Sequence, residues 1–234
     1  MTAPPVSLLM TVRDGERYLE AALRSALEQT VPPHEIVVVD DGSSDRTPDI
    51  LRDFGGALTV LHQPPTGMAA GLNRALRQAR HEVVAFLDAD DFYTPDAMET
   101  RLARLEADDA PDAVGGWMVQ FASPEMDAAA IRRLRFDPGP VKGALLGAVI
   151  LRRAWFTRVG PLNEDFQLAP TIDWMARARS RGLRMAWTDS VVLHRRIHTT
   201  NLTQRRRAEE HQALLSVVRG HHHRAQQSKG AAPG

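Results

Sequence analysis

The sequence predicts an α/β fold, with an open, mostly parallel sheet and helices on both faces. Short runs rich in β-branched residues are apolar at nearly every position, as expected for strands that are covered on both faces. The segments between them carry apolar residues at helical spacing. Through roughly the first 110 residues the two patterns alternate as β-α-β-α-β-α-β-α, which is the order of a sheet built from βαβ units.

The first βαβ unit has the clearest pattern. Its strands are VSLLMTV (Val6–Val12) and EIVVVDD (Glu35–Asp41). The helix between them is predicted from apolar residues that recur once per helical turn. These residues are Tyr18, Leu19, Ala22, Leu23, Ala26 and Leu27.

Three more helical patterns follow in this half of the chain. DRTPDILRDF (45–54) predicts a helix, since Pro48 suits a first turn. The strand EVVAFLDAD (82–90) lies between the other two helices. The helix before this strand contains Met68, Leu72, Leu76 and Ala79, and the helix after it, opened by Pro95, contains Met98, Leu102 and Leu105.

The second half is less regular. The predicted strands are GGWMVQF (115–121), GALLGAVILRR (143–153), LRMAW (183–187) and SVVLH (190–194), and IDWMARARSRG (172–182) is a predicted helix that ends at Gly182. We expect residues 1–219 to form one domain. Residues 220–234 are polar, rich in Gly and Ala, and aperiodic, which predicts a disordered tail.

The composition argues against several classes of protein. Lys and Arg (29) balance Asp and Glu (29), so no overall positive field favours nucleic acid as a partner. The lack of cysteine excludes disulfides, thiolate metal sites and cysteine nucleophiles, and is consistent with a reducing compartment. We find neither a signal peptide nor a run of about 18 apolar residues. We therefore expect no integral membrane segment and a cytoplasmic location, and peripheral attachment to a membrane is left open.

One short stretch, FLDADDFYTPD (Phe86–Asp96), gathers three carboxylates at the end of an apolar run. Side chains alternate along a strand, so we expect Asp88 and Asp90 on one side and Ala89 on the other. Adjacent carboxylates repel, and a divalent cation relieves the repulsion. Oxygen ligands favour Mg²⁺ or Mn²⁺, with coordination completed by substrate phosphates and water. The alternative is that Asp88 is solvated and that Asp90 or Asp91 caps the next helix.

A second acidic strand end, VVVDDGSSDRT (37–47), contains Asp40 and Asp41. A carboxylate at this position accepts hydrogen bonds from a ribose hydroxyl or a base N–H. The alternative is a turn with a helix cap, for which residues 42–45 suffice. The chain has no GxxxxGK[ST] loop, and no GxGxxG precedes a helix. These absences argue against P-loop enzymes and Rossmann dinucleotide enzymes.

Several motifs together resemble glycosyltransferase family 2. VSLLMTVRDGERYLEAALRSALEQTVPPHEIVVVDDGSSDRT resembles the opening of its members, and FLDADDFYTPDAM resembles their metal-binding segment. VILRRAWFTRVGPLNEDF, DWMARARSRG and RRIHTTN extend the resemblance, which runs from about Val6 to Asn201. The family consists of inverting enzymes of GT-A fold that use nucleotide-diphosphate sugars. The resemblance implies one GT-A domain (1–219), with a nucleotide-binding half up to about residue 110 and an acceptor-side half from about residue 111.

The resemblance also implies roles for individual residues. Asp90 would hold a divalent metal, Mn²⁺ or Mg²⁺, on the diphosphate, and Asp88 would reach the ribose side. Asp41, with Asp40 beside it, resembles the acidic contact to the base. His198 resembles a late histidine that in some relatives returns to the metal or the diphosphate. The implied nucleotide-binding residues are Thr11, Arg13, Asp14, Asp40, Asp41, Asp88 and Ala89, and the implied metal ligands are Asp90 and His198.

Three positions depart from the family pattern. Arg13 stands where many members have an aromatic residue beside the base, and Gly-Leu-Asn (71–73) stands where many have ARN. Pro170 and Thr171 replace the usual ED, which leaves Asp173 as the only carboxylate in TIDWMARA. This last departure bears on the identity of the catalytic base.

Inversion at a sugar carbon requires a base that deprotonates the acceptor. Asp173 is the expected base, because it starts a predicted helix whose dipole favours a carboxylate at that end. The alternative is that Asp173 only caps this helix, in which case Glu164 or Asp165 is the base. Trp174, beside Asp173, is either a platform for an acceptor sugar or a core residue.

The predicted function is therefore inverting transfer of a sugar from a nucleotide-diphosphate sugar, expected to be a UDP-sugar. The acceptor is left open as a glycan, lipid, peptide or small molecule. Arg195, Arg196 and the run Arg205–Arg207 either clamp the diphosphate or lie solvated. One alternative is a non-catalytic sugar-nucleotide-binding protein, which the missing ED pair favours. Another is a nucleotidyltransferase, whose glycine-rich basic phosphate loop is absent from TVRDGERY.

Overall fold

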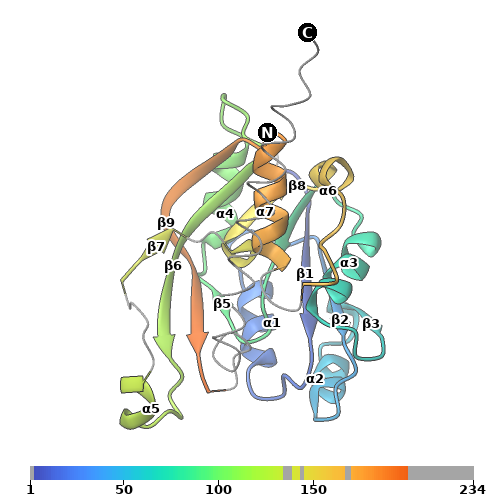
Figure 1. Ribbon diagram of the computed structural model, residues 1–234, viewed down its shortest axis with the longest axis vertical. Coiled ribbons are helices and arrows are strands. Elements are labelled where there is room, and N and C mark those ends of the chain that lie inside the picture. Colours follow the sequence, from blue (N-terminus) through green and yellow to red (C-terminus); the bar gives the residue numbers. More distant parts are fainter. Residues whose placement is uncertain (1–2, 134–138, 143–144, 167–169, 200–234) are drawn as a thin grey trace.

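The computed structural model describes residues 3–133, 139–142, 145–166 and 170–199. Its centre is one nine-stranded sheet with helices on both faces (Figure 1). The strand order is β3-β2-β1-β4-β8-β6-β9-β5, and β7 pairs with β6 outside this path. The α/β class predicted from the sequence is confirmed.

The first four strands form a parallel half. β1 pairs with β2 on one side and with β4 on the other, and β3 pairs with β2. These strands are β1 (Val6–Val12), β2 (Glu35–Asp40), β3 (Thr59–His62) and β4 (Val83–Phe86). The helices of this half are α1 (Leu19–Leu27), α2 (Thr47–Asp53), α3 (Met68–Gln78) and α4 (Ala97–Leu105), with a 3-10 turn, η1 (Gly55–Ala57), after α2. The spacing of apolar residues predicts all four of these helices correctly.

Beyond β4 the sheet is mixed. β8 runs antiparallel to both β4 and β6, whereas β6 and β9 run parallel to each other. β5 closes the edge against β9. These strands are β5 (Phe92–Tyr93), β6 (Ala113–Ala122), β7 (Val141–Lys142), β8 (Val149–Arg152) and β9 (Met185–Ile197). The helical segments of this half are α5 (Ala128–Arg133), η2 (Leu146–Ala148), α6 (Ala154–Val159) and α7 (Pro170–Ser180).

Two strand predictions in this half need correction. Residues 185–187 of LRMAW and all of SVVLH belong to one strand, β9, because the pairing of β6 with β9 shifts register at Gly115/Trp117 and Trp117/Met118 instead of breaking. Such irregularities absorb extra residues without ending a strand. In GALLGAVILRR only Val149–Arg152 is strand, since the 3-10 turn η2 precedes it.

Each face of the sheet packs against its own hydrophobic cluster. Along β1, Leu8 and Met10 belong to the cluster that contains Leu23 of α1, whereas Leu9 belongs to the cluster that contains Trp174 of α7. Successive side chains of a strand point to opposite faces. Each fully buried side chain of this size contributes roughly 1.5–3 kcal/mol relative to exposure. The double coverage explains why the strands have almost continuous apolar sequences.

The order of the strands reverses at β1. β2 and β3 lie on one side of β1, and β4 and the mixed half lie on the other. In open α/β sheets, ligands bind beyond the carboxyl ends of the strands at such a reversal. The segments that follow β1, β2 and β4 therefore frame the candidate site.

Some predictions lie outside the described residues. The tail (220–234) and the run Arg205–Arg207 are among them, and the single domain over residues 1–219 stays a prediction. Within the part of the chain that the structure describes, no helix combines the length and the apolar character needed to cross a membrane.

Candidate active site

Three carboxylates meet in the turn that follows β4. β4 ends at Phe86, and the Asp91 N–H donates to the Asp88 carbonyl (3.1 Å). Asp88, Asp90 and Asp91 each place a carboxylate oxygen within 4.8 Å of the others. A turn therefore brings them together, rather than the strand alternation expected from the sequence. We call Asp88–Asp91 the acid turn.

The crowding of the acid turn raises carboxyl pKa values. The pKa of Asp88 is raised to about 6, chiefly because surrounding protein atoms displace water from its carboxyl. The negative charge of Asp90 adds to the rise, and the positive charge of Arg195 opposes it. Asp88 is nevertheless an exposed residue, as the solvated alternative expects, so contact with water weakens the effect of burial on its pKa. Burial, together with the charges of Asp90 and Asp88, raises the pKa of Asp91, which is 4% exposed. A nearby cation stabilises carboxylates that repel in this manner.

Asp91 fixes the acid turn to the end of β9. Its Oδ1 accepts a hydrogen bond from the Arg196 N–H (2.8 Å), and Arg196 Nε donates to the Asp90 carbonyl (3.0 Å). The first turn of α4 is capped by Gln29, whose Oε1 accepts from the Met98 N–H (2.9 Å). The carboxylate of Asp91 is thus committed to β9, and the helix cap comes from another residue.

His198 reaches the acid turn from just beyond β9. Its Nε2 lies 3.0 Å from Asp90 Oδ2, although the two residues are 108 positions apart in the sequence. The ring is 6% exposed and packs on Tyr18, with the ring centroids 4.7 Å apart. Only the family resemblance pointed to this pairing in the sequence. A role of His198 as a metal ligand stays a prediction.

The acidic end of β2 has a different environment. Asp41 Oδ1 accepts from Gln63 Nε2 (2.8 Å) and from the N–H (2.8 Å) and hydroxyl (3.1 Å) of Thr66, and Oδ2 accepts from the Gly67 N–H (2.8 Å). Burial raises the pKa of Asp41, but these hydrogen bonds outweigh burial, so the net pKa is lowered. Asp41 thereby anchors the segment that leads into α3. Contact of Asp40 or Asp41 with a base stays a prediction.

The loop after β1 is tied to the loop after β2. Asp14 has a φ of +51°, and its Oδ1 accepts from the N–H (2.8 Å) and hydroxyl (3.2 Å) of Ser44. Its own N–H donates to Ser43 Oγ (2.9 Å). Arg13 is exposed beside it. Thr11 Oγ1, by contrast, is buried and has no hydrogen-bond partner among the described residues.

Asp173 lies in the first turn of α7 and is 3% exposed. Its Oδ2 is 2.7 Å from Arg177 Nε, in an i,i+4 ion pair. The last turn of α7 and the start of β9 lie at the top of Figure 1, whereas β1 ends lower in the view. The first turn of α7 is therefore directed toward the carboxyl end of β1. This direction agrees with the position expected of a base. The catalytic role of Asp173 stays a prediction.

The alternatives around Asp173 also have defined positions. Glu164 and Asp165 are exposed, and Glu164 Oε1 accepts from Asn73 Nδ2 (2.8 Å). Trp174 is 0% exposed and stacks on Phe156, with ring centroids 4.1 Å apart. Trp174 is therefore a core residue, and the acceptor-platform alternative is wrong.

A polar cluster beside the acid turn is absent from the sequence predictions. Ser123 and Glu125, just beyond β6, form hydrogen bonds with Tyr18 at the start of α1. Arg17 Nη1 lies 3.4 Å from Glu125 Oε1. Tyr18 and Glu125 are 107 positions apart, and no local pattern signals such a pairing. Only the fold of the complete sheet brings them together.

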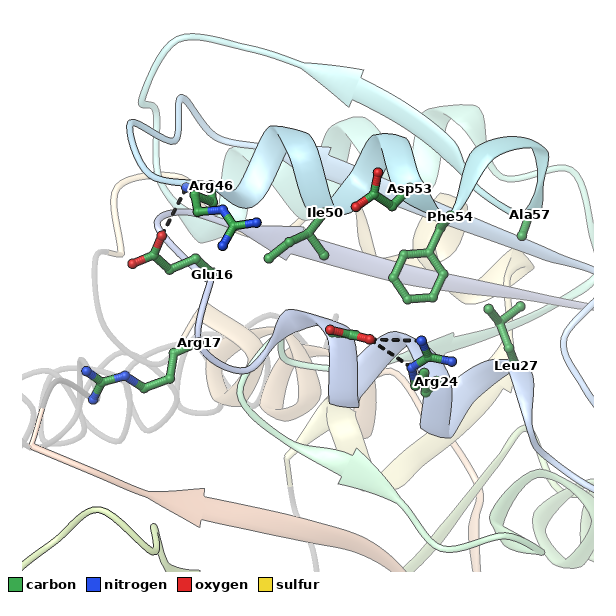
Figure 2. A pocket seen from close by; sticks show the side chains of 10 residues that line it. Glu16, Arg17, Arg24, Leu27, Arg46, Ile50, Asp53, Phe54 and Ala57 are labelled. Atoms are coloured by element: carbon green, nitrogen blue, oxygen red, sulfur yellow. Dashed lines mark hydrogen bonds and ion pairs between the residues drawn. The ribbon is translucent and has the colours of Figure 1, made fainter.

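A cavity of about 830 Å³ lies between α1 and α2 (Figure 2). Leu27, Ile50 and Phe54 line it, and its charged residues carry both signs. Arg24 and Glu20 of the lining form an ion pair (2.8 Å), and Glu16 Oε2 accepts a hydrogen bond from the backbone N–H of Arg46 (3.2 Å). None of the three carboxylates of the acid turn lines this cavity. It is separate from the candidate site.

A family model described as Glycosyl transferase family 2 matches residues 7–160. The chain belongs to glycosyltransferase family 2. This family 2 domain is similar to the putative glycosyltransferase EpsH of Bacillus subtilis, with 28% identity over 222 residues. The alignment covers 88% of this chain but 64% of EpsH, so the chain spans less than two thirds of that relative.

Two solved structures share its fold. TarS of S. aureus (residues 1–349, in complex with UDP) aligns with a TM-score of 0.66 and 20% identity, over 83% of this chain and 61% of that one. The mannosyltransferase PcManGT of Pyrobaculum calidifontis, in complex with GDP-Man and Mn²⁺, aligns with a TM-score of 0.71 and 21% identity, over 94% of this chain and 65% of that one. The predicted GT-A fold is confirmed.

Proposed function

We propose that this family 2 domain transfers a sugar, with inversion, from a nucleotide-diphosphate sugar to an acceptor hydroxyl, with a divalent cation at the acid turn. The observation that carries the proposal is the acid turn itself. Three carboxylates lie within 4.8 Å of one another beside the reversal of strand order, in a chain that belongs to the family. We also propose a cytoplasmic location, because a chain without cysteine is consistent with a reducing compartment.

The residues present fit a divalent cation. The donor set of the acid turn consists of carboxylate oxygens, which suit Mg²⁺ and Mn²⁺. Loss of water around its carboxyl, and after it repulsion from Asp90, raises the pKa of Asp88 to about 6. Asp90 would hold the cation, with His198 Nε2 3.0 Å from the same carboxylate. A cation bound there supplies electrostatic stabilisation of the leaving diphosphate. The Mn²⁺ in the structure of PcManGT supports the same choice.

A nucleotide-diphosphate donor is supported by two features. The two structural neighbours are complexes with UDP and with GDP-Man. In this chain, the strand order reverses at β1, and ligands bind beyond the carboxyl ends of the strands at such a reversal. We propose a UDP-sugar, with Asp88 on the ribose side and Asp40 or Asp41 near the base. Arg13 and Asp14 would border the nucleotide from the loop after β1, and the backbone of Ala89 would border it from the acid turn.

The chemical step requires a base for the acceptor. The acceptor oxygen forms a bond to the anomeric carbon, the bond from that carbon to the diphosphate oxygen breaks, and the electron pair leaves with the diphosphate. The acceptor proton passes to a carboxylate, which we propose is Asp173. Arg177, with its Nε 2.7 Å from Asp173 Oδ2, fixes the orientation of this carboxylate.

One observation favours a second candidate function. The carboxylate of Asp173 is 3% exposed and ion-paired with Arg177, and Pro170 and Thr171 offer no second acid. A site without an accessible base would bind the sugar nucleotide without transferring the sugar. Turnover by the purified protein separates the two functions.

The donor is tested by a binding screen followed by a turnover assay. We expect UDP-sugars with Mn²⁺ to raise the melting temperature more than GDP- or dTDP-sugars do, and EDTA to abolish the rise. The selected donor is then incubated with acceptor mixtures, and release of free nucleoside diphosphate is measured. Binding without release under any acceptor would support the non-catalytic candidate, and no binding would contradict both.

The base is tested with Asp173→Asn, which is nearly isosteric but accepts no proton. We expect kcat to fall by about 100-fold or more, with little change in donor binding. Asp165→Asn tests the exposed alternative in the preceding loop, and it should retain kcat if Asp173 is the base. Near wild-type turnover by Asp173→Asn would exclude Asp173 as the base and direct the search to Glu164 or Asp165.

A further inference from the structure

Arg196 joins three segments of the chain at the acid turn. Its N–H donates to Asp91 Oδ1 (2.8 Å), and its Nε donates to the Asp90 carbonyl (3.0 Å). Its Nη1 donates to Ser123 Oγ (3.4 Å), just beyond β6. Arg196 lies two residues before His198, whose Nε2 is 3.0 Å from Asp90 Oδ2. The contacts of Arg196 therefore fix the spacing between Asp90 and His198, which come from distant parts of the sequence.

Aromatic rings hold the guanidinium of Arg196. Its central carbon lies 4.7 Å from the ring centroid of Tyr18 and 4.8 Å from that of Phe121. A guanidinium packed on ring faces gains cation–π attraction and loses freedom to rotate. Its hydrogen bonds and its packing together orient Arg196 inward, toward the segments that it joins.

Tyr18 connects Arg196 to His198 and to the polar cluster. The Tyr18 ring packs on His198, with centroids 4.7 Å apart, and its hydroxyl is hydrogen-bonded to Glu125. Although burial opposes the effect, hydrogen bonds from Ser123 and Tyr18 lower the pKa of Glu125 to about 2. Tyr18 is thus held at its hydroxyl by a carboxylate that is ionised at neutral pH.

Arg195, the preceding residue, has different surroundings. Among the described residues its side chain makes no hydrogen bond or ion pair, although its charge acts on the carboxyls of Asp88 and Asp91. An arginine whose donors are open beside the acid turn is suited to bind a diphosphate. Arg196 is less suited, because its Nε and Nη1 already donate to the Asp90 carbonyl and to Ser123.

We propose that Arg196 is a positioning residue, which holds Asp90 and His198 together for the divalent cation and does not bind the diphosphate itself. The inference rests on the proposed function. Partners that orient metal ligands typically change metal affinity by about 10- to 100-fold. If Arg196 acted only through its charge, its loss would raise the metal affinity, because removal of a positive charge near three carboxylates strengthens cation binding. The direction of the change therefore distinguishes positioning from simple charge.

The test titrates Mn²⁺ alone into the full-length chain and follows the EPR signal of the free ion. We expect Arg196→Met to weaken Mn²⁺ binding by about 10-fold or more. Arg196→Lys keeps the charge and can replace only part of the hydrogen bonds, so its affinity should lie between those of Arg196→Met and the wild type. Arg195→Met is the matched control, since it removes the same charge one residue away, and it should bind Mn²⁺ as tightly as the wild type or more tightly.

A second titration separates the two arginines by their effect on the nucleotide. With Mn²⁺ saturating for each variant, we expect Arg195→Met to weaken binding of UDP by about 10-fold, as for loss of a charged hydrogen-bonding partner. Arg196→Met, under the same conditions, should bind UDP within about threefold of the wild type. The opposite pattern would assign the diphosphate to Arg196 and overturn the proposal.

Two further outcomes would also overturn the proposal. Mn²⁺ binding by Arg196→Met that equals or exceeds that of the wild type refutes positioning and leaves the proposed function standing. Failure of the wild type to bind Mn²⁺ refutes the metal-assisted function and this inference with it. If Arg196→Met does not fold by circular dichroism, Arg196→Lys decides the question. Its charge is unchanged, so a loss of affinity is positional and an unchanged affinity contradicts the proposal.

Discussion

The ends of β2 and β4 have almost the same sequence character but opposite environments. At the end of β2, Asp41 accepts hydrogen bonds from Gln63, Thr66 and Gly67, and the net effect is a lowered pKa. At the end of β4, the carboxylates of the acid turn lie within 4.8 Å of one another, and crowding and mutual repulsion raise the pKa of Asp88 to about 6. The carboxylate at the end of β2 has its hydrogen-bond partners within the protein, whereas the acid turn at the end of β4 is suited to bind a cation.

The difference shows that an acidic strand end is not in itself a ligand site. A carboxylate whose lone pairs are filled by N–H donors stabilises the fold, and removing it leaves those donors unsatisfied. Carboxylates that repel one another destabilise the fold until a cation binds, and removing one relieves the repulsion. The account therefore assigns Asp41 chiefly to the scaffold and Asp90 chiefly to function.

The largest expected effect is on ligand binding by the acid turn. Asp90→Ala should weaken Mn²⁺-dependent binding of UDP by about 100-fold or more, the upper range for losing a direct contact to a metal site. Its melting temperature should fall less than that of Asp41→Ala, because loss of a repelling charge offsets loss of the Asp90 contact with His198 (3.0 Å). Calorimetry of UDP binding with Mn²⁺ and with EDTA measures the effect. Equal UDP affinity in both buffers for the wild type would refute the role of the acid turn.

The next effect is on stability, at the end of β2. Asp41→Ala removes the acceptor of the Thr66 and Gly67 N–H groups, and we expect a loss of about 3 kcal/mol in the free energy of unfolding. For a domain of this size that corresponds to a melting temperature lower by roughly 6–12 °C. Asp53→Ala, at an exposed position, should change stability by less than about 0.5 kcal/mol. Equal melting temperatures for both variants would show that Asp41 does not anchor α3.

A smaller effect concerns the close packing of α3 against β1. A Cβ on Gly71 of α3 would lie 2.3 Å from Thr11 Oγ1 on β1. Gly→Ala in a helix normally stabilises by roughly 0.5–1 kcal/mol. Here we expect Gly71→Ala to destabilise by about 1–3 kcal/mol, as overpacking does. Thermal melting measures the loss, and adding Thr11→Ala should restore most of it. A gain in stability for Gly71→Ala alone would show that α3 and β1 are not in close contact.

The smallest effect is on the pH dependence of stability. A carboxyl with a lowered pKa in the folded state stabilises the fold above its unfolded value of about 3.9, and this contribution disappears as the pH falls through the folded pKa. The stability difference between wild type and Asp41→Asn should therefore shrink between about pH 5 and about pH 3. Urea unfolding at each pH measures it. A difference that is constant over this range would contradict the lowered pKa of Asp41.

Much of the scaffold is readable from the sequence. β1 and β2 are packed on both faces, so their apolar runs stand out, and α1 to α4 follow the spacing of their buried residues. The gathering of carboxylates after β4 is also predictable, because three aspartates fall within four positions at a strand end, although a turn and not strand alternation brings them together. β5, with two residues, is too short to leave a pattern. The sequence of β9 predicts two strands, because the polar Thr188 and Asp189 separate its two apolar runs, whereas shifts in pairing register carry one strand through.

The environment of each carboxylate cannot be predicted from the sequence pattern. The donors to Asp41 come from the segment before α3, and the contact of Asp91 with Arg196 spans 105 positions. Whether a given aspartate is satisfied or repelled depends on these tertiary partners. The sequence therefore predicts where acids gather, and the structure decides which of them are available to a ligand.

The most direct test compares Asp41→Asn and Asp90→Asn in one thermal melting experiment, with and without Mn²⁺. Without the metal, we expect Asp41→Asn to melt below the wild type and Asp90→Asn to melt at or above it. With Mn²⁺, the melting temperatures of the wild type and Asp41→Asn should rise, and that of Asp90→Asn should not. A rise for Asp90→Asn equal to that of the wild type, or an Asp41→Asn protein as stable as the wild type, would contradict the division between a structural and a functional acidic strand end.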